Sequence, residues 1–392
     1  MIGSELPKGW NKVKLLDIAD LSTGKVDANH STEDGLYPFF TCASEPMKSP
    51  DYSFDDESVI VPGNGANVGC VLYYNGKFQA YQRTYVLSNI KIVPKYLYYH
   101  FLRYWKERTE NNQFGSATNY VKLINFANYI VDMPSLTEQK QIAEKLDKLF
   151  DQIETIKEAS NKIPELLKNF RQQVLTYAVT GKLTDSDYES WELKTLDEIA
   201  IPKAGYAFKA TDFIDNGIQV IRMGNLYDNK LSLDRNPVFV PKNYDTDIIE
   251  RSRVKRNDIL LTLTGTKYKR DYGYAIKIDT DEVLLLNQRI LSLTPLIDPD
   301  YLLLVLRSDE FRNQFFEFET GGVNQGNVGV KNVMTIKLHI PSPRIQEEIV
   351  RRTKILFNIL DNVERRYNIL CEKLDKLPQA LLCKAFNGKL AL

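Results

Sequence analysis

The sequence has little of what several protein classes require. Its 392 residues include four cysteines and three histidines, and none of the cysteines forms a CxxC pair. Neither a zinc site nor a disulfide framework is therefore expected. No stretch approaches the roughly 20 apolar residues of a membrane span, and the first residues lack a signal-peptide pattern. These absences predict a reduced, cytoplasmic protein without a membrane segment.

Catalytic motifs are also absent. The nearest match to an adenine methyltransferase motif (Asn/Asp-Pro-Pro-Tyr/Phe) is Asn236-Pro237-Val238-Phe239, which has valine in place of the second proline. Gly63 to Gly69 lacks the glycine spacing of a dinucleotide loop, and a β-like run follows it where a helix is needed. The histidines lack metal-ligand spacing. We therefore expect no catalytic residue, metal or cofactor in this chain.

The charge composition still permits binding to nucleic acid at local sites. Lysine and arginine total 51, as do aspartate and glutamate, so the net charge is zero. This balance argues against nonspecific nucleic-acid binding over the whole surface, but it permits local basic patches. The length predicts two or three domains.

The sequence contains one long stretch twice. Pro134 to Leu183 matches Pro341 to Leu390 at a constant offset of 341 − 134 = 207 residues. The segments before them are also related, because the opening at Trp10 recurs at Trp191, an offset of 181. The second block thus carries 207 − 181 = 26 extra residues. Such a repeat predicts an architecture of block, helix, block, helix.

The repeated stretch has the heptad spacing of a coiled coil. Ser135 to Glu138 has the spacing of a capping box, Gly181 stands beyond the expected helix end, and Pro164 must kink or restart the helix. Ser342 and Pro343 provide a cap and a first-turn proline for the second copy. The predicted seam and partner residues are Ile142, Leu146, Leu149, Ile153 and Ile156, and then Ile349, Leu356, Leu360, Val363 and Leu370.

The predicted fold is α+β, with two pseudo-symmetric α/β domains separated by two long helices that form an antiparallel coiled coil. We place the boundaries at residues 1–133, 134–181, 182–340 and 341–392. A helix of roughly 37 residues is about 55 Å long, which exceeds the roughly 34 Å of one DNA turn. The alternative is a tandem duplication with a purely structural helical linker.

The run from Pro134 to Asp147 resembles the conserved helical region of type I restriction-modification specificity subunits, as do the endings Gly181-Lys182-Leu183 and Gly388-Lys389-Leu390. The openings Leu6 to Trp10 and Trp191 resemble the starts of that family's target recognition domains, and the match spans the whole chain.

The resemblance implies that each block reads one half of a bipartite double-stranded DNA target. It implies that the helices fix the spacing and dock two methyltransferase subunits, which restriction subunits join. The partners would hold S-adenosylmethionine, ATP and magnesium. The alternative is a coiled-coil scaffold without sequence-specific DNA readout.

DNA readout needs forked donors and acceptors for base edges and cations for phosphates. The alternatives for these residues are a solvated basic loop, a solvated charged face and, for the Gln82-Arg83 and Gln288-Arg289 pairs, a structural role. Tyr37, Phe39 and Phe40 are expected in the core, and the alternative is that they are stacking platforms. The DNA-binding candidates are Asn64, Asn67, Lys77, Arg83, Asn119 and Lys122 in the first block. In the second block they are Arg222, Asn225, Arg251, Arg253, Thr266, Lys267, Tyr268, Lys269, Arg270, Arg289, Asn324, Gln325 and Asn327.

Overall fold

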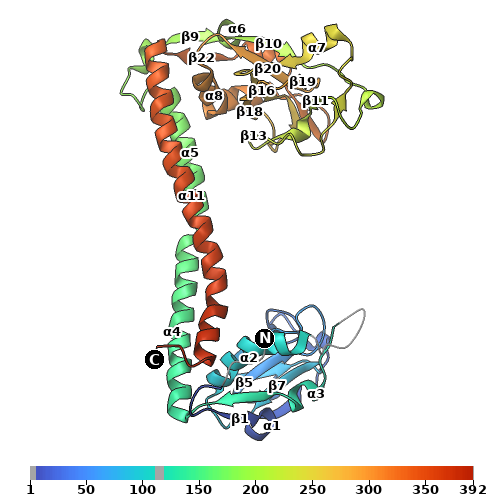
Figure 1. Ribbon diagram of the computed structural model, residues 1–392, viewed down its shortest axis with the longest axis vertical. Helices are drawn as coiled ribbons and strands as arrows, with labels where there is room; N and C mark the ends of the chain where they lie inside the picture. The colour runs from blue at the N-terminus through green and yellow to red at the C-terminus, as the bar shows by residue number, and fades with distance from the viewer. Residues whose placement is uncertain (1–5, 111–118, 392) are drawn as a thin grey trace. The chain divides into compact units, whose positions relative to one another are not determined.

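The structure is a computed structural model that describes residues 6–110 and 119–391. Its internal contacts divide the chain into two compact units. The first unit runs to Asn161 and resumes at Tyr367, and the second comprises Lys162–Arg366. Each unit combines an α/β domain with segments of long helix (Figure 1), so the predicted α+β class is confirmed. Among the described residues, no helix is both long and apolar enough to cross a membrane.

The first unit is built on a six-stranded sheet. Its strand order is β2-β7-β5-β6-β3-β4, and only β3 and β6 pair in parallel. A separate antiparallel pair, β1 with β8, leads into the first long helix. The strands are β1 (Asn11–Lys14), β2 (Asp20–Thr23), β3 (Tyr37–Phe40), β4 (Met47–Ser49), β5 (Phe54–Pro62), β6 (Leu72–Ala80), β7 (Thr84–Ser88) and β8 (Ile130–Met133).

Helices cover one face of this sheet. They are α1 (Leu15–Ile18), α2 (Pro94–Glu110) and α3 (Leu123–Ala127). Figure 1 shows α2 beside β5, and α2 contacts both β5 and β6. The shared core contains Tyr96, Phe101 and Trp105 of α2, all fully buried. Phe39 and Phe40 are buried and Tyr37 is half-buried, so the expectation that these aromatics belong to the core is confirmed.

The second unit divides its strands between two four-stranded sheets. Their orders are β10-β20-β16-β18 and β14-β11-β19-β15, with β11 and β19 parallel. The strands are β10 (Ala200–Ala204), β11 (Ile218–Ile221), β14 (Phe239–Val240), β15 (Arg253–Val254), β16 (Ile259–Thr262), β18 (Ala275–Lys277), β19 (Leu284–Leu286) and β20 (Ile290–Pro295). Three further pairs are β9 (Glu192–Thr195) with β22 (Lys337–Ile340), β12 (Leu226–Tyr227) with β13 (Lys230–Leu231), and β17 (Thr264–Thr266) with β21 (Gln325–Asn327).

The helices of the second unit pack on these sheets. They are α6 (Leu196–Ile199), α7 (Thr246–Ser252), α8 (Pro299–Arg307), α9 (Asp309–Glu317) and α10 (Val330–Met334). The long strand β6 of the first unit has two counterparts here, β18 and β19, which belong to different sheets. The short elements β12, β13, α7 and β15 lie in the longer second block, where the sequence comparison placed the extra residues.

The first copy of the repeat forms two helices. Helix α4 (Leu136–Ser160) ends at a C-cap on Asn161, and α5 (Ile163–Val179) begins with Pro164 in its first turn. The predicted restart at this proline is confirmed. Ser135 Oγ accepts a hydrogen bond from the Glu138 amide, but the Glu138 carboxylate accepts the Trp10 indole N–H at 3.1 Å. The predicted capping box is therefore only half formed.

The second copy is one helix, α11 (Pro343–Phe386, 44 residues), which contains Pro378 and contributes to both units. In the first unit, Lys157 of α4 pairs with Asp375 of α11 at 3.6 Å. In the second unit, Arg171 of α5 pairs with Asp361 at 2.5 Å, and Arg352 donates to the Leu183 carbonyl. Partner numbers fall along α11 as they rise along α5, so this helix pair is antiparallel.

Two buried glutamines, 207 residues apart, join each α/β domain to its following helix. Gln139 Nε2 donates to the Pro134 carbonyl at 3.0 Å, and its Oε1 accepts the Val93 amide at 3.1 Å. Gln346 makes the same two bonds, to the Pro341 carbonyl at 2.8 Å and from the Asp298 amide at 3.2 Å. Both side chains are almost completely enclosed. The repeat thus preserves an atomic contact as well as a helical pattern.

The predicted seam is only partly buried. Ile142, Leu146, Ile153, Ile349 and Leu360 are buried, while Leu149 and Leu356 are half-buried. Ile156, Val363 and Leu370 are 44, 41 and 37% exposed, so the chain alone does not bury them in the seam, and their role as partner residues stays a prediction. Two helices cover only a narrow stripe of each other, and the break at Asn161 interrupts the heptad register of the first copy.

Candidate functional site

A turn containing glutamine and arginine occupies the same position in both units. Arg83 and Arg289 are exposed, and their carbonyls accept the Gly63 amide at 3.0 Å and the Leu263 amide at 3.3 Å. Each turn packs against a glycine. A Cβ added at Gly24 would lie 1.9 Å from the Ala80 carbonyl oxygen. This equivalence makes the turn a shared scaffold, as its sequence echo suggested.

Glycine is required in the second unit for the same reason. A Cβ at Gly205 would lie 2.1 Å from the Asn287 carbonyl oxygen, so no larger residue fits without moving the backbone. The backbone around both turns is therefore held in one geometry, and only the side chains differ.

In the first unit, three separate loops meet beside the Arg83 turn. Asn64 forms an isolated β-bridge with Tyr120, and the Gly65 amide donates to the Asn119 carbonyl at 2.9 Å. Lys122 Nζ lies 5.6 Å from the centre of the Tyr120 ring. The structure thus brings together four predicted contact residues: Asn64, Arg83, Asn119 and Lys122.

Two other candidates of the first unit are placed differently. Asn67 Nδ2 donates to the Cys42 carbonyl at 2.8 Å, which uses part of its amide to hold the loop. Lys77 lies on β6 over the Tyr52 ring, 4.7 Å from its centre. A hydrogen bond with Tyr52 raises the pKa of Lys77, so this side chain is a cation held on an aromatic ring.

In the second unit, two loops that are far apart in sequence form one two-stranded ribbon. Thr266 pairs with Gln325 and Thr264 with Asn327. The ribbon is close-packed at its base, because a Cβ at Gly326 would lie 2.4 Å from Glu319 Oε1. Glu319 accepts a hydrogen bond at 2.7 Å from Tyr272, whose pKa is raised by burial.

The tip of this ribbon is cationic and open. Tyr268 is 79% exposed, Lys269 and Asn324 are exposed, and Lys267 donates to the Gly321 carbonyl at 3.3 Å. Arg270 donates to Asn313 Oδ1 at 3.1 Å. We call residues 264–270 with 324–327 the ribbon. It unites eight predicted contact residues: Thr266, Lys267, Tyr268, Lys269, Arg270, Asn324, Gln325 and Asn327.

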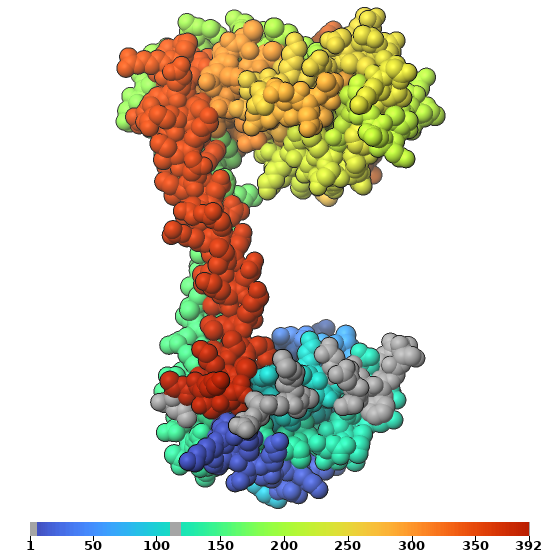
Figure 2. All heavy atoms as spheres, viewed as in Figure 1, coloured from blue at the N-terminus to red at the C-terminus, as the bar shows by residue number. Residues whose placement is uncertain are grey.

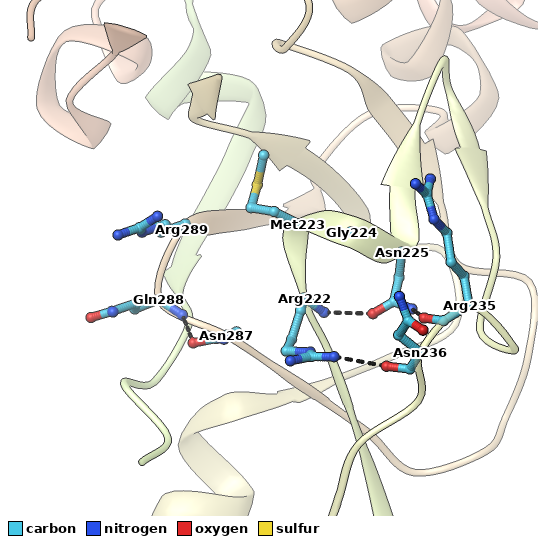
Figure 3. Close-up of a pocket in the computed structure, with 9 residues that line it drawn as sticks. All are labelled: Arg222, Met223, Gly224, Asn225, Arg235, Asn236, Asn287, Gln288 and Arg289. Carbon is cyan, nitrogen blue, oxygen red and sulfur yellow. Dashed lines mark hydrogen bonds between the residues drawn. The ribbon is translucent and has the colours of Figure 1, made fainter. Parts of the chain in front are cut away.

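A cavity of about 400 Å³ lies beside the Arg289 turn (Figure 3). Arg222 crosses one side of it and donates through Nη2 to the Asn236 carbonyl at 2.7 Å. The cavity is lined by Arg222, Met223, Gly224, Asn225, Arg235, Asn236, Asn287, Gln288 and Arg289. The sequence pointed to Arg222, Asn225 and Arg289 but missed Arg235. The turn-forming Asn236-Pro237 dipeptide that follows Arg235 marked a loop there.

The structure corrects the prediction for Asn225. Its side chain is 3% exposed, and Nδ2 donates to the carbonyls of Ser232 at 2.9 Å and Arg235 at 2.8 Å. Its Oδ1 accepts the Arg222 amide at 2.9 Å. Because the backbone uses both ends of the amide, Asn225 shapes the loop and presents nothing to a base.

The basic run after α7 does not form a continuous track. Arg251 is exposed, while Arg253 is half-buried in β15. Arg256 pairs with Asp281 at 2.9 Å and Asp279 at 2.6 Å, and the hydrogen bond with Asp281 raises its pKa. Of the two predicted contact residues in this run, Arg251 and Arg253, Arg251 is the exposed one and is better placed for a phosphate.

The long helices carry apolar side chains that the antiparallel pairing leaves open. On α5 these are Leu166, Phe170 and Tyr177, and on α11 they include Ile355 and Ile359, at 48 and 55% exposure. Figure 2 shows α11, in orange to red, uncovered on the viewed side within each unit. Exposed apolar side chains on neighbouring turns of a helix indicate a protein contact surface.

Among the described residues, no group of three or more His, Cys, Asp or Glu side chains could hold a metal ion.

Two related α/β domains with a common turn and different loops define a protein with two recognition domains. The sequence profile of the type I restriction modification DNA specificity domain matches residues 7–165 and again 188–370. The chain belongs to this family, as its motifs predicted.

Two curated relatives match along the whole chain. The type I restriction enzyme EcoDI specificity subunit of Escherichia coli is 31% identical over 411 residues, covering 100% of this chain and 90% of the relative. The MjaVIII specificity subunit of Methanocaldococcus jannaschii is 23% identical over 412 residues, covering 100% and 95%. This kinship with specificity subunits confirms the expected non-catalytic class.

Solved structures share the fold. The HsdS subunit from Thermoanaerobacter tengcongensis superposes with a TM-score of 0.67 at 15% identity, covering 99% of each chain. A chain from a structure on complex assembly and conformational transition of the type I R-M system gives a TM-score of 0.73 at 15% identity, covering 99% of this chain and 100% of that one.

Proposed function

We propose that this chain is the specificity subunit of a type I restriction-modification complex and that each α/β domain reads one half of a bipartite DNA target. One observation carries the proposal: the two domains repeat the same turn on the same strand pair but surround it with different loops. A repeated scaffold with unlike loops suits two readers of unlike sequences.

The first domain presents Asn64, Arg83, Asn119 and Lys122 to its half-site. The second presents the ribbon, the arginine-lined cavity and Arg251. Arginine and amide side chains supply the forked donors and acceptors that base edges require, and lysines supply phosphate contacts. The net charge of zero keeps the attraction local to these faces.

The helices serve as spacer and docking surface. The exposed apolar face of α5 and α11 would receive two methyltransferase subunits, which restriction and translocase subunits join. These partners would bind S-adenosylmethionine, ATP and magnesium. The four cysteines are unpaired, which suits a reducing cytoplasm.

The decisive experiment is co-expression with a type I methyltransferase subunit from the same genome, followed by purification and mapping of methylated adenines. We expect a stable complex that methylates an asymmetric, interrupted motif. A complex that forms but methylates no such motif would support the alternative, a scaffold without sequence-specific readout.

Docking is tested by one matched pair of variants on α11. Ile359 is 55% exposed on the apolar face, and its neighbour Asn358 is exposed beside it. Ile359→Glu should prevent co-purification of the methyltransferase without lowering the melting temperature of the isolated subunit, whereas Asn358→Glu should leave assembly unchanged. Equal assembly of both variants would exclude this face as the docking surface.

A further inference from the structure

The two domains differ at one position of their shared scaffold. The residue that opens each turn donates its amide to the end of the parallel strand, Tyr81 to the Phe40 carbonyl at 2.9 Å and Asn287 to the Ile221 carbonyl at 3.1 Å. The parallel strand's last residue is followed by Thr41 after Phe40 in the first domain and by Arg222 after Ile221 in the second. The second domain therefore has a guanidinium where the first has a short hydroxyl.

Arg222 is held in place on several sides. Its amide donates to Asn225, its Nη2 donates to the Asn236 carbonyl, and its guanidinium carbon lies 5.8 Å from the centre of the Phe213 ring. These contacts limit the directions in which the guanidinium can point. A side chain fixed in this way suits readout of a base, because base edges discriminate through geometry.

The guanidinium also has unused hydrogen-bonding capacity. Its Nε is enclosed and has no acceptor within the described part of the chain. Nη2 is bonded to the Asn236 carbonyl, and no hydrogen bond of Nη1 is formed among the described residues, so Nη1 is left to donate to a ligand. The cavity lining contains arginines and amides but no carboxylate that could take this place.

The other arginines of the cavity are less constrained. Arg235 and Arg289 are exposed, and Figure 3 shows Gln288 and Arg289 projecting from their turn in a different direction from the Arg222 side chain. Exposed cations suit phosphate oxygens, which any DNA sequence offers. The cavity thus combines one guanidinium held by several contacts with two exposed ones at its edge.

We propose that Arg222 reads a guanine in the half-site of the second domain, with Arg235 and Arg289 on neighbouring phosphates. Guanine offers two adjacent acceptors, O6 and N7, in the major groove, and a guanidinium donates to both. The inference rests on the proposed DNA-recognition function and assigns one base to one residue.

The test uses the complex with the methyltransferase and a DNA duplex carrying the mapped motif. Each guanine of the second half-site is replaced in turn by 7-deazaguanine, which lacks the N7 acceptor. One replacement should weaken binding about 2- to 12-fold, about half the free energy of a forked base contact, because the O6 acceptor remains. The same replacement should have no effect on the Arg222→Gln complex, because the contact is already lost.

The control variant is Arg256→Gln, which removes an exposed arginine that is already paired with Asp279 and Asp281. It should retain full sensitivity to 7-deazaguanine. A half-site without guanine, or one insensitive to every replacement, would overturn the inference. A loss for Arg222→Gln that is equal for all sequences, with a shallower salt dependence, would reassign Arg222 to a phosphate.

The experiment separates the inference from the function on which it rests. If the wild-type complex methylates no bipartite motif, the proposed function fails before any variant is compared. If the motif exists but ignores N7, only the role of Arg222 fails. Should Arg222→Gln not fold, the 7-deazaguanine series on the wild-type complex still decides whether a guanine N7 is read there.

Discussion

His100 is fully enclosed in the first unit, and both of its ring nitrogens are engaged. Nδ1 lies 3.0 Å from the Tyr129 hydroxyl, and Nε2 accepts the Asp132 amide at 3.2 Å. Burial lowers the pKa of His100 to about 4. A proton on Nε2 would remove the acceptor for the Asp132 amide, so the folded state favours the neutral ring.

The first unit should therefore lose stability in mild acid. The unfolded chain takes up a proton near pH 6.5, whereas folded His100 does so only near its pKa of about 4. The contribution of His100 to the free energy of unfolding is fully present above the unfolded pKa of about 6.5. It is lost progressively as the pH falls from 6.5 toward 4. The loss between pH 7 and pH 5 should be about 2 kcal/mol. Urea unfolding of the full chain, followed at both pH values, measures it.

Two variants check the assignment to His100. His100→Gln should remove most of this pH dependence, whatever its effect at pH 7. His30, which pairs with Asp51 on the surface, serves as the matched control, and His30→Gln should not diminish the loss in acid. An acid loss that persists in His100→Gln would point to a different group.

The buried glutamines give a second prediction at this scale. Gln139→Ala leaves the Val93 amide and the Pro134 carbonyl without their partner, which should cost about 2 to 3 kcal/mol of unfolding free energy. Gln141 is exposed on the same helix, and Gln141→Ala should cost almost nothing. Thermal unfolding of the two variants compares them, and similar losses would exclude a special role for Gln139.

At the residue scale, the sequence predicted which loops carry candidate DNA contacts better than it predicted which side chain in each loop is available. It indicated the loop after Ile221, and both Arg222 and Asn225 line the cavity, but Asn225 is buried and its amide is bonded to the backbone. No local pattern separates them, because their fates depend on the carbonyls of Ser232 and Arg235, which lie several residues away.

At the scale of elements, the ribbon places three cations, Lys267, Lys269 and Arg270, in the turn that follows β17. Lys267→Ala and Lys269→Ala together should weaken DNA binding by the assembled complex and make its dependence on salt shallower. The slope of log K against log salt should fall by up to about 2, since each phosphate contact contributes about 0.9. Titrations at several salt concentrations give this slope.

Lys337 provides the matched control, because it is exposed on β22 and outside the predicted contact set. Lys337→Ala should leave the slope unchanged. A slope that stays the same in the double variant would remove the ribbon from the DNA interface.

Helices were predicted more accurately than strand pairs. The 207-residue repeat, the caps and Pro164 placed α4, α5 and α11 correctly, because helical signals lie within a few residues of one another. The ribbon could not be foreseen, since Thr266 and Gln325 are far apart in sequence and nothing local selects the pairing. The exposure of some seam residues could not be foreseen, because heptad spacing does not show which partner covers a residue.

At the scale of the whole molecule, we expect the length of the helices to set the gap between the two DNA half-sites. We expect a matched insertion of seven residues, after Ile156 in α4 and after Asp375 in α11, to lengthen the helix pair beside the Lys157–Asp375 contact. Seven residues add about 10 Å, which corresponds to about 3 base pairs of DNA. Mapping methylated adenines should show the same two half-sites with a longer gap.

An insertion in α4 alone is the control, because it breaks the register of the pair and should abolish specific methylation. If the matched insertion leaves the gap unchanged, the helices do not measure it, although they can still dock partners.

Helix α11 also ties the first unit to residues made much later. Leu382, Ala385 and Phe386 complete its core, with the Phe386 ring 5.4 Å from Tyr96 and 5.2 Å from His100. At a synthesis rate of roughly 5 to 20 residues per second, the ribosome needs about 11 to 45 seconds to reach these residues after finishing α4. During that interval the apolar surface of α2 that these residues cover is exposed to solvent. A messenger RNA truncated before the codon for Leu382 would therefore yield a chain in which the core of the first unit, too, is incomplete.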